Sequence, residues 1–367
     1  MNVKLAKRAA IAAGVAALSL GLAMPTAQAD PGSDPVTGSN FRELVGVGSD
    51  TTQDVLNGLA NEVQDPDLDP ASLLIASYDA VDPATGAVHG NITTRAGHSP
   101  VQRPNGSGEG VNGLAADITA GTNNFDFARS SSAPSHPASD GISGTWVPFA
   151  LDAVTVAVSG TSTLPANFTT QQLTRAYNCQ DPATGNPLAA GQFPVIGGVT
   201  VHPLVPQAGS GTRKFWAATL GFNATTLPSC VKDTDKDGVS VEEHDGGSLK
   251  RTVAADGAED IAPFSIAQYI AQSNSAVTGV RNRIHGAQLR SIDNVAPVVS
   301  SKLNTSFPIH RDVYNVFQTS RLTEPDIAQA FVGPNSDVCA STDVIQEYGF
   351  GTLTDCGSTS VTGALIL

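Results

Sequence analysis

Short apolar runs alternate with amphipathic segments along most of the chain. The run at 44–48 (LVGVG) predicts a strand, and the apolar residues that recur at helical spacing from Val55 to Val63 predict a helix directly after it. The longest apolar run, 148–159 (PFALDAVTVAVS), predicts a buried strand. Further strand-like or helix-like patterns lie at 72–77, 111–118, 125–128, 168–177, 201–205, 215–220, 261–270 and 313–317. This alternation predicts an α/β fold with mostly parallel sheets.

The N-terminal segment has the three parts of an export signal. Basic residues precede an apolar run at 9–23, and small residues at 27–29 (AQA) supply a cleavage site. The apolar run is shorter than the roughly 20 residues that span a membrane, and no cysteine follows it to carry a lipid anchor. We therefore expect a signal peptide at 1–29 and a mobile leader at 30–40. The remainder is expected to be secreted or periplasmic, with no lipid anchor and no transmembrane helix.

Acidic side chains outnumber basic ones. The chain has 34 Asp and Glu against 20 Lys and Arg, a net charge of −14. It therefore lacks the basic surface that neutralises nucleic-acid phosphates or anionic lipid headgroups. Hydrophobic residues make up 40% of the sequence, which excludes wholesale disorder. We expect a globular protein with no nucleic-acid partner.

Four cysteines follow the expected signal peptide: Cys179, Cys230, Cys339 and Cys356. An even number in an exported protein predicts two disulfides, for which three connectivities are possible. We expect Cys179–Cys230 and Cys339–Cys356, because this pairing keeps each bridge within one half of the chain. The sequence contains no CxxC pair, so a zinc site is not expected.

Four turns rich in Ser, Thr and Gly lie where a predicted strand ends or a predicted helix begins. They are residues 49–52, 106–108, 130–132 and 209–212. Such turns present unpaired backbone N–H groups, hydroxyl donors and the positive end of a helix, which together bind oxyanions. Open α/β sheets place ligands at the carboxyl ends of their strands, so four such turns predict one anion site. A single turn of this kind is more often an ordinary helix cap.

The order of these segments resembles a known family. Residues 46–52, 106–108, 126–134, 148–158 and 209–212 look like the ordered signatures of the phosphate-binding proteins of ABC importers, and 292–297 and 307–311 are similar to that family's late segments. The resemblance implies a type 2 periplasmic-binding-protein-like fold, in which two α/β lobes, each a mixed sheet flanked by helices, enclose a ligand cleft. It also implies capture of inorganic phosphate, or a similar tetrahedral oxyanion, for uptake through an ABC permease. The implied protein is a monomer with no cofactor and no catalytic residues.

The resemblance also assigns site residues, position by position. The expected ligand-binding residues are Asp50, Thr51, Ser107, Ser132, Ser210, Gly211 and Thr212. Independently of the resemblance, Arg129 and Arg213 stand beside two of the turns and are expected to assist through charge-assisted hydrogen bonds. Either arginine is explained equally well by a surface salt bridge.

Two positions depart from the family pattern. Pro206 and Gln207 stand where the family has an arginine, and Ser132 stands in the third turn in place of a carboxylate. In the family that carboxylate accepts the proton of a protonated phosphate, so its loss weakens discrimination against fully ionised oxyanions. Asp50 is the candidate that restores an acceptor.

Two segments divide the chain into lobes. The predicted strand at 148–159 leads from one lobe to the other, and 307–314 leads back. We expect lobe I at 36–153 plus 305–367, and lobe II at 154–304.

A different motif predicts a cation site. Asp233, Asp235 and Asp237, followed by glycine, match the first positions of a calcium-binding loop. The position of the closing bidentate Glu is His244, however, and Glu243 lies one place early. The loop fits either a secreted calcium-dependent interaction module or an acidic surface hairpin held by a disulfide.

Catalytic signatures are weak in this sequence. The run 209–211 (GSG) misses the GxSxG nucleophile elbow by one residue, and the seven histidines do not form HExxH or another ligand spacing. The polar run 242–245 (EEHD) either lines a cleft or lies in solvent. A secreted phosphoester hydrolase is therefore the less favoured alternative.

Overall fold

The computed structural model describes residues 30–32, 38–65, 72–250 and 257–366. The expected signal peptide, 1–29, and part of the expected leader, 33–37, lie outside the described residues. In the part that is described, no helix is long and apolar enough to cross a membrane.

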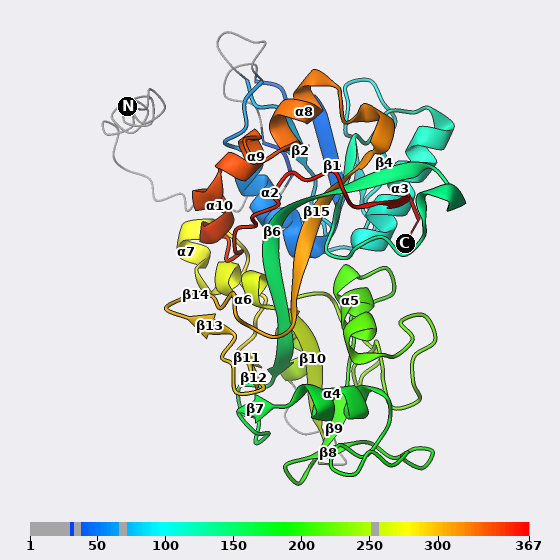
Figure 1. Ribbon diagram of the computed structural model, residues 1–367, viewed down its shortest axis with the longest axis vertical. Coiled ribbons are helices and arrows are strands. Elements are labelled where there is room, and N and C mark those ends of the chain that lie inside the picture. The colour runs from blue at the N-terminus through cyan, green and yellow to red at the C-terminus, as the bar shows by residue number, and fades with distance from the viewer. Residues whose placement is uncertain (1–29, 33–37, 66–71, 251–256, 367) are drawn as a thin grey trace.

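Ten strands of the described chain form one mixed sheet that runs through two lobes (Figure 1). In the upper lobe its order is β2 (Ile75–Ser77), β1 (Leu44–Gly48), β5 (Phe127–Ser130), β15 (His310–Gln318) and β6 (Ser143–Val158). In the lower lobe β6 is followed by β10 (Glu259–Ser265), β9 (Val199–Pro203) and β8 (Val195–Ile196). Two further strands, β11 (Gln288–Leu289) and β16 (Thr362–Ala364), also pair with β6.

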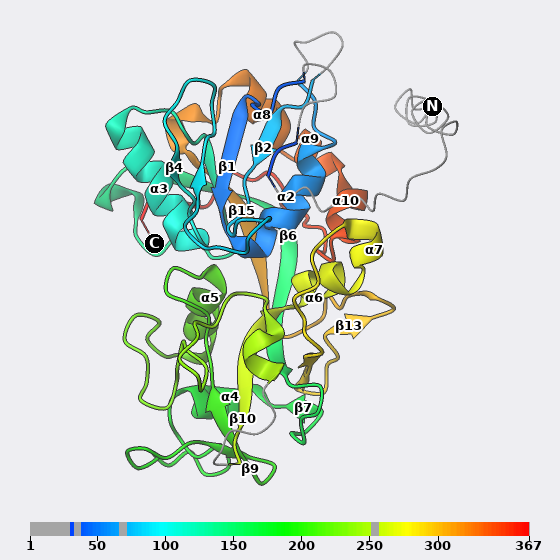
Figure 2. The same cartoon turned by 180° about the vertical axis from the view of Figure 1, so that it is seen from behind.

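Strand β6 belongs to both lobes. Its residues Gly144 to Ala153 pair with β15, and its residues Val154 to Val158 pair with β10. The strand predicted at 148–159 is confirmed, and it begins five residues earlier than expected. In both views β6 and β15 run together from one lobe toward the other (Figures 1 and 2).

The expectation of mostly parallel sheets is wrong. Strand β1 is parallel to β2 and to β5, and β10 is parallel to β9. The pairs β15–β5, β15–β6, β10–β6, β11–β6, β16–β6 and β8–β9 are antiparallel. The physical reason is the crossing itself: β6 leaves the upper lobe while β15 returns to it, so the two strands run in opposite directions.

Helices cover the sheet in both lobes. They are α2 (Gln53–Ala60), α3 (Ser107–Ala120), α4 (Thr170–Tyr177), α5 (Gly211–Leu220), α6 (Ile266–Ser273), α7 (Ser275–Thr278), α8 (Pro325–Phe331), α9 (Asp337–Ala340) and α10 (Thr342–Glu347). Short two-residue strands are β3 (Asn91–Ile92), β4 (Val101–Gln102), β7 (Asn167–Phe168), β12 (Ser291–Ile292), β13 (Val298–Val299) and β14 (Lys302–Leu303). Four 3₁₀ turns, at Asp50–Thr52, Ala138–Asp140, Gly246–Lys250 and Thr319–Arg321, complete the described elements.

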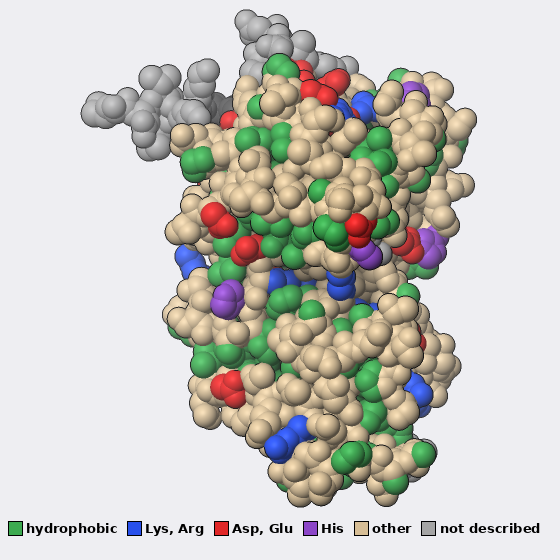
Figure 3. Space-filling view, turned by 45° about the vertical axis from the view of Figure 1, so that its right-hand side comes forward, with side chains coloured by type: hydrophobic (Ala, Val, Ile, Leu, Met, Phe, Trp, Pro, Cys, Tyr) green, Lys and Arg blue, Asp and Glu red, His purple; other side chains and the backbone are tan. Residues whose placement is uncertain are grey.

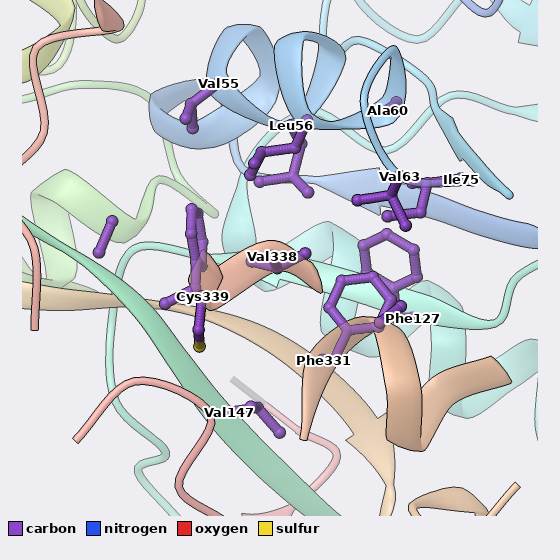
Figure 4. Close-up of a cluster of buried hydrophobic side chains, with 14 of the residues drawn as sticks. Val55, Leu56, Ala60, Val63, Ile75, Phe127, Val147, Phe331, Val338 and Cys339 are labelled. Carbon is purple, nitrogen blue, oxygen red and sulfur yellow. The ribbon is translucent and has the colours of Figure 1, made fainter. Parts of the chain in front are cut away.

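Each lobe has its own apolar core. In the upper lobe, Val55 and Leu56 of α2 pack with Phe127 and Phe331, whose ring centroids lie 5.1 Å apart (Figure 4). In the lower lobe, Tyr177 of α4 contacts Trp216 of α5 edge-on, with ring centroids 5.7 Å apart. Full burial of one such large apolar side chain contributes about 1.5–3 kcal/mol, so these helices are held mainly by their core faces.

Two of the predicted helix starts are capped as the residue types require. Thr169 opens α4 with a capping box, in which its side chain accepts from the Gln172 backbone N–H. Ser210 opens α5 and accepts from the Arg213 N–H at 2.9 Å. Before α2 the chain forms a 3₁₀ turn at Asp50–Thr52, and neither Ser49 nor Thr52 makes a side-chain cap there.

Both disulfides form as expected, Cys179–Cys230 and Cys339–Cys356. The first lies in the lower-lobe core and the second in the upper-lobe core. Each bridge therefore ties together segments of one lobe. The lobe boundaries themselves, 36–153 plus 305–367 and 154–304, stay a prediction.

Candidate functional site

The four predicted turns meet between the lobes. The Gly108 N–H of the second turn donates to the Gly209 carbonyl of the fourth at 2.9 Å. The Ser107 hydroxyl lies 3.2 Å from that of Ser131 in the third turn. The hydroxyls of Thr51 in the first turn and Thr212 in the fourth lie 3.4 Å apart. Segments separated by up to 161 residues thus place their hydroxyls at one point.

Glycine is required where these turns touch. A Cβ on Gly211 would lie 2.3 Å from both the Ser107 and the Ser131 hydroxyl oxygens. A Cβ on Gly106, whose φ is +107°, would lie 2.9 Å from the Gly209 carbonyl oxygen. The close approach of the turns therefore depends on the absence of side chains at these positions.

A carboxylate from outside the four turns lies where they meet. Glu243 Oε2 accepts from Thr51 Oγ1 at 3.0 Å and from Thr212 Oγ1 at 3.4 Å. Both hydroxyls in turn accept from Arg311 Nη2, at 3.4 and 3.0 Å respectively. Each threonine therefore links a guanidinium to a carboxylate. We call the four turns, Glu243 and Arg311 together the four-turn site.

His244 completes this network. The Ser265 backbone N–H donates to His244 Nδ1 at 3.2 Å, so that nitrogen carries no proton and Nε2 is the N–H of the ring. Nε2 lies 2.8 Å from Thr51 Oγ1 and 3.3 Å from Glu243 Oε2. Burial raises the pKa of Glu243, but hydrogen bonding to His244 and Ser210 and the positive charge of Arg311 outweigh it and lower that pKa to about 2. Glu243 is therefore ionised at neutral pH.

Arg311 is held by a buried acid on the neighbouring crossing strand. Its Nε and Nη2 donate to Asp152 Oδ2 at 3.1 and 2.9 Å, and its Nη1 donates to the Ser131 carbonyl at 3.0 Å. The other oxygen of Asp152 accepts from Ser265 Oγ at 2.7 Å and from the Ala267 N–H at 3.2 Å. These contacts fix the orientation of the Arg311 guanidinium, so that its Nη2 faces the hydroxyls of Thr51 and Thr212.

Asp50 does not supply a free acceptor to the four-turn site. Its carboxylate pairs with Arg283 Nη2 at 3.0 and 3.2 Å and is almost completely buried. The carboxylate that the Thr51 and Thr212 hydroxyls contact is that of Glu243, a residue from another segment of the chain.

A metal ion is poorly matched to this cluster. Among the described residues, Asp50, Glu243 and His244 bring possible ligand atoms within 4.8 Å of one another. However, Asp50 already pairs with Arg283, and His244 presents an N–H rather than a lone pair toward Glu243.

The two arginines expected to assist the ligand are engaged elsewhere. Arg129 is fully buried and donates to the carbonyls of Gly46, Ser49, Gly48 and Tyr78 and to the Ser77 hydroxyl. Burial lowers its pKa to about 10. Arg213 donates to Asp233 Oδ2 at 2.8 Å and to the carbonyls of Pro206 and Ala224. Neither presents a free guanidinium edge to the four-turn site, where the described guanidinium that contacts Thr51 and Thr212 is that of Arg311.

Ser132 and Ser210 lie at the edge of the network. The Ser132 hydroxyl is buried and has no partner among the described residues, and it is Ser131 whose hydroxyl contacts Ser107. Ser210 caps α5 through its hydroxyl oxygen. Their role as ligand-binding residues stays a proposal.

The acidic loop at 233–238 forms a hairpin in which its carboxylates have separate partners. Asp233 pairs with Arg213, Asp237 pairs with Lys236 at 3.1 Å, and Asp235 accepts from the Asp237 and Val239 N–H groups at 2.8 and 3.1 Å. These contacts correspond to the acidic-hairpin interpretation of the motif and leave the calcium interpretation without converging ligands in the described loop.

Sequence prediction left Glu243, Arg311 and Asp152 out of the site. The signals were present: Glu243 lies in the polar run 242–245, and Arg311 ends the late segment 307–311 that carries part of the resemblance. Asp152 is an acid inside an apolar strand, where a charge is retained only with a partner. None of the three could be paired without knowing how the lobes meet.

Comparison with known proteins gives matches at two levels. A family model for the PBP superfamily domain matches residues 36–333. The chain is similar in structure to a protein from Clostridium perfringens described as a phosphate ABC transporter substrate-binding protein and solved with bound phosphate, with 14% identity, a TM-score of 0.52, and coverage of 85% of this chain and 100% of that one. It is also similar to an ABC-type phosphate transport receptor from Vibrio cholerae, with 14% identity, a TM-score of 0.46, and coverage of 85% and 100% respectively.

No curated protein matches the chain. At 14% identity, the likeness to the Clostridium protein shows a common fold. Together with the family match, it confirms the predicted two-lobe α/β fold class.

Proposed function

Since the chain belongs to the PBP superfamily, we propose that it is an exported solute-binding protein. It captures inorganic phosphate, or a similar tetrahedral oxyanion, at the four-turn site between its lobes and delivers it for uptake. The ligand-binding residues in this proposal are Thr51, Ser107, Ser132, Ser210, Gly211 and Thr212, with Arg311 in the place first expected for Arg129 or Arg213.

The observation that carries the proposal is the convergence of four donor-rich turns on one buried point. The helices α3 and α5 direct their N-termini there, with Ser107 and Gly211 as their first residues. Backbone N–H groups at helix N-termini carry partial positive charge and favour anions by about 0.3–1 kcal/mol each at exposed sites and more when buried. Three side chains add further donors at this point. The hydroxyls of Thr51 and Thr212 donate to Glu243, and the guanidinium of Arg311 donates to the Thr212 hydroxyl.

The choice of phosphate draws on the similar structures. The Clostridium protein, which shares the fold, is described as a phosphate transporter's binding protein and was solved with phosphate. The order of the four turns along this chain also resembles that of phosphate-binding proteins. An overall negative charge of −14 does not oppose this proposal, because exposed charges more than about 10 Å away are largely screened by salt, whereas local donors are not.

Basic side chains lie along the waist between the two lobes on the face shown in Figure 3. Lys214, in α5 of the lower lobe, donates to the Ala133 carbonyl at 3.3 Å and to the Ser135 hydroxyl at 3.1 Å. Lys214 therefore places a positive charge between the two lobes, where it favours an anion.

The proposed activity is capture and release, with no bond made or broken. The expected partners are the oxyanion and the permease of an ABC importer, and the protein acts as a monomer outside the cytoplasm, with no nucleic-acid partner. The donors of the four-turn site bind oxygen atoms by hydrogen bonds alone, so no catalytic residue is assigned.

Calorimetric titration of the mature chain with phosphate, sulfate and calcium tests the proposal. We expect heat with phosphate, and its loss in the Thr51→Val/Thr212→Val double variant, which keeps the shape of both side chains. Thr219→Val, an exposed position in the same helix as Thr212, is the matched control and should bind as the wild type does. Heat with calcium and none with either oxyanion would instead support the interaction module, and release of product from a phosphoester would support the hydrolase.

A further inference from the structure

Glu243 lies in the position that the proposed ligand would take. Its carboxylate is completely buried, and Oε2 accepts from the hydroxyls of the first and fourth turns. The second oxygen, Oε1, is also buried and has no hydrogen-bond partner among the described residues. The donor array around Glu243 is therefore used by one carboxylate oxygen only, while the buried hydroxyls of Thr52 and Ser132 in the same turns also lack a described partner.

The charges around the site are otherwise balanced in pairs. Arg311 pairs with Asp152 at 2.9 Å, and Arg283 pairs with Asp50 at 3.0 Å. Among the described residues Glu243 forms no ion pair with an arginine or lysine, and it is stabilised by hydroxyls, His244 and the shared field of Arg311. An oxyanion placed beside it would meet an uncompensated like charge at short range, where the low effective dielectric makes repulsion strong.

Glu243 lies in a short segment, residues 233–244, that begins with a hairpin; we call this segment the Glu243 strap. Residues 233–241 form a hairpin, with a Thr234–Ser240 bridge and a hydrogen bond from the Val241 N–H to the Asp233 carbonyl at 2.9 Å. Directly after Glu243, His244 has a φ of +54°, a backbone conformation that is costly for a residue with a side chain. His244 is held there by contacts from Gln272 to its carbonyl and from Ser265 to its ring.

We propose that Glu243 is a resident anion that determines the affinity of the four-turn site. Its carboxylate fills the oxyanion position in the unliganded protein, and a free oxyanion binds only by displacing it. The site is then a competition between a tethered carboxylate and a diffusing anion, and the strained turn at His244 favours withdrawal of the strap. The identity of the diffusing anion as phosphate rests on the proposed function. The occupation of the site by Glu243 does not.

The first experiment compares phosphate binding by calorimetry in the wild type and in Glu243→Gln, which keeps the shape and removes the charge. We expect the dissociation constant to fall at least tenfold. Glu242→Gln, one residue earlier and only partly buried, is the matched control and should leave it unchanged. An equal or weaker affinity in Glu243→Gln would overturn the proposal, because it would mean that the carboxylate assists the ligand or does not meet it.

The second experiment fills the site with a small carboxylate. In Glu243→Ala, sodium formate at millimolar concentration should raise the thermal unfolding midpoint by several degrees relative to sodium chloride at equal ionic strength, because formate replaces the missing group. The wild type should show no such shift. If formate stabilises neither protein, Glu243 does not occupy an anion position and the proposal fails.

The two experiments separate this inference from the proposed function. Formate rescue without phosphate binding in either the wild type or Glu243→Gln would keep Glu243 as a resident anion and would remove phosphate as the ligand. Phosphate binding that is unaffected by Glu243→Gln would keep the function and overturn the inference. Should Glu243→Ala fail to fold, Glu243→Gln alone decides through its phosphate affinity.

Discussion

Arg311 of β15 and Asp152 of β6 face each other in register on the two strands that cross between the lobes. Their side chains form a buried ion pair at 2.9 Å, with 3% and 0% of their surfaces exposed. The pair connects the backbone that joins the lobes to the hydroxyls of Thr51 and Thr212. The same residues thus hold the interlobe connection and orient the main cation of the four-turn site.

Removing the acid of this pair should both destabilise the protein and weaken its site. In Asp152→Asn, Arg311 keeps a buried charge without a counterion, which costs roughly 3–5 kcal/mol. Urea unfolding of the variant should show a loss of that size, and phosphate affinity should fall because the guanidinium is no longer fixed.

Asp140→Asn is the control for this change, since Asp140 is a largely exposed aspartate paired with His136 at 3.6 Å. It should cost less than about 1 kcal/mol, as surface ion pairs do. A wild-type unfolding midpoint in Asp152→Asn would contradict the role assigned to the pair.

Gly211→Ala should disrupt the meeting of the turns. The added methyl group would lie 2.3 Å from two hydroxyl oxygens, so the second and third turns would have to move away from the fourth. We expect phosphate affinity to fall tenfold or more, together with a loss of stability of about 1–3 kcal/mol, the usual cost of overpacking.

Gly113→Ala provides the comparison for Gly211→Ala. A Cβ at this position inside α3 meets its nearest atoms at 3.6 and 3.7 Å, which is ordinary contact. Because alanine is the better helix former, this variant should be more stable by up to about 1 kcal/mol and should bind as the wild type does. Unchanged phosphate binding in Gly211→Ala would contradict the prediction, because it would show that the turns accommodate a methyl group at position 211.

Acidification from pH 7 to pH 5 should stabilise the fold through Asp54. Burial raises the pKa of this carboxyl from its usual 3.8 to about 6. The folded protein therefore binds the proton more tightly than the unfolded chain does, and the stabilisation is fully present below about pH 4 and is lost as the pH rises through 6. Burial also raises the pKa of Asp79 well above its usual value, which acts in the same direction.

The measurement is the free energy of unfolding in urea at pH 5 and pH 7. We expect the difference between the two values to shrink in Asp54→Asn and to persist in Asp237→Asn, which changes an exposed carboxylate. A protein that is more stable at pH 7 than at pH 5 in both the wild type and Asp237→Asn would contradict the assignment.

Local patterns were sufficient to predict most of the elements and the disulfide pairing. The strand at 44–48, the capped helix after Thr169 and the helix after Ser210 follow from periodicity and capping chemistry, which act over a few residues. The four turns were found for the same reason, since each is a strand end or a helix start. The order of the turns along the chain then suggested that they meet.

The partners of the turns could not be predicted in this way. Arg311 lies 260 residues from Thr51, and Glu243 lies 192 residues from it. Which arginine reaches the site depends on the crossing of β6 and β15, and sequence proximity pointed to Arg129 and Arg213 instead. Those two lie beside the turns in sequence, but their guanidiniums are taken up by nearby carbonyls and by Asp233.

The Cys179–Cys230 bridge should contribute more to stability than Cys339–Cys356 does, and it should also act on the site. The bridges close loops of 51 and 17 residues, for which the chain-entropy model gives about 4 and about 3 kcal/mol. Cys230 also anchors the chain just before the hairpin at 233–241, which precedes Glu243. Cys179→Ala/Cys230→Ala should loosen this anchor, ease withdrawal of the Glu243 strap and so tighten phosphate binding. Cys339→Ala/Cys356→Ala should lose stability, and its phosphate affinity should stay unchanged. Urea unfolding and phosphate calorimetry on the two double variants check both parts, and equal effects on affinity would show that the hairpin is not coupled to its disulfide.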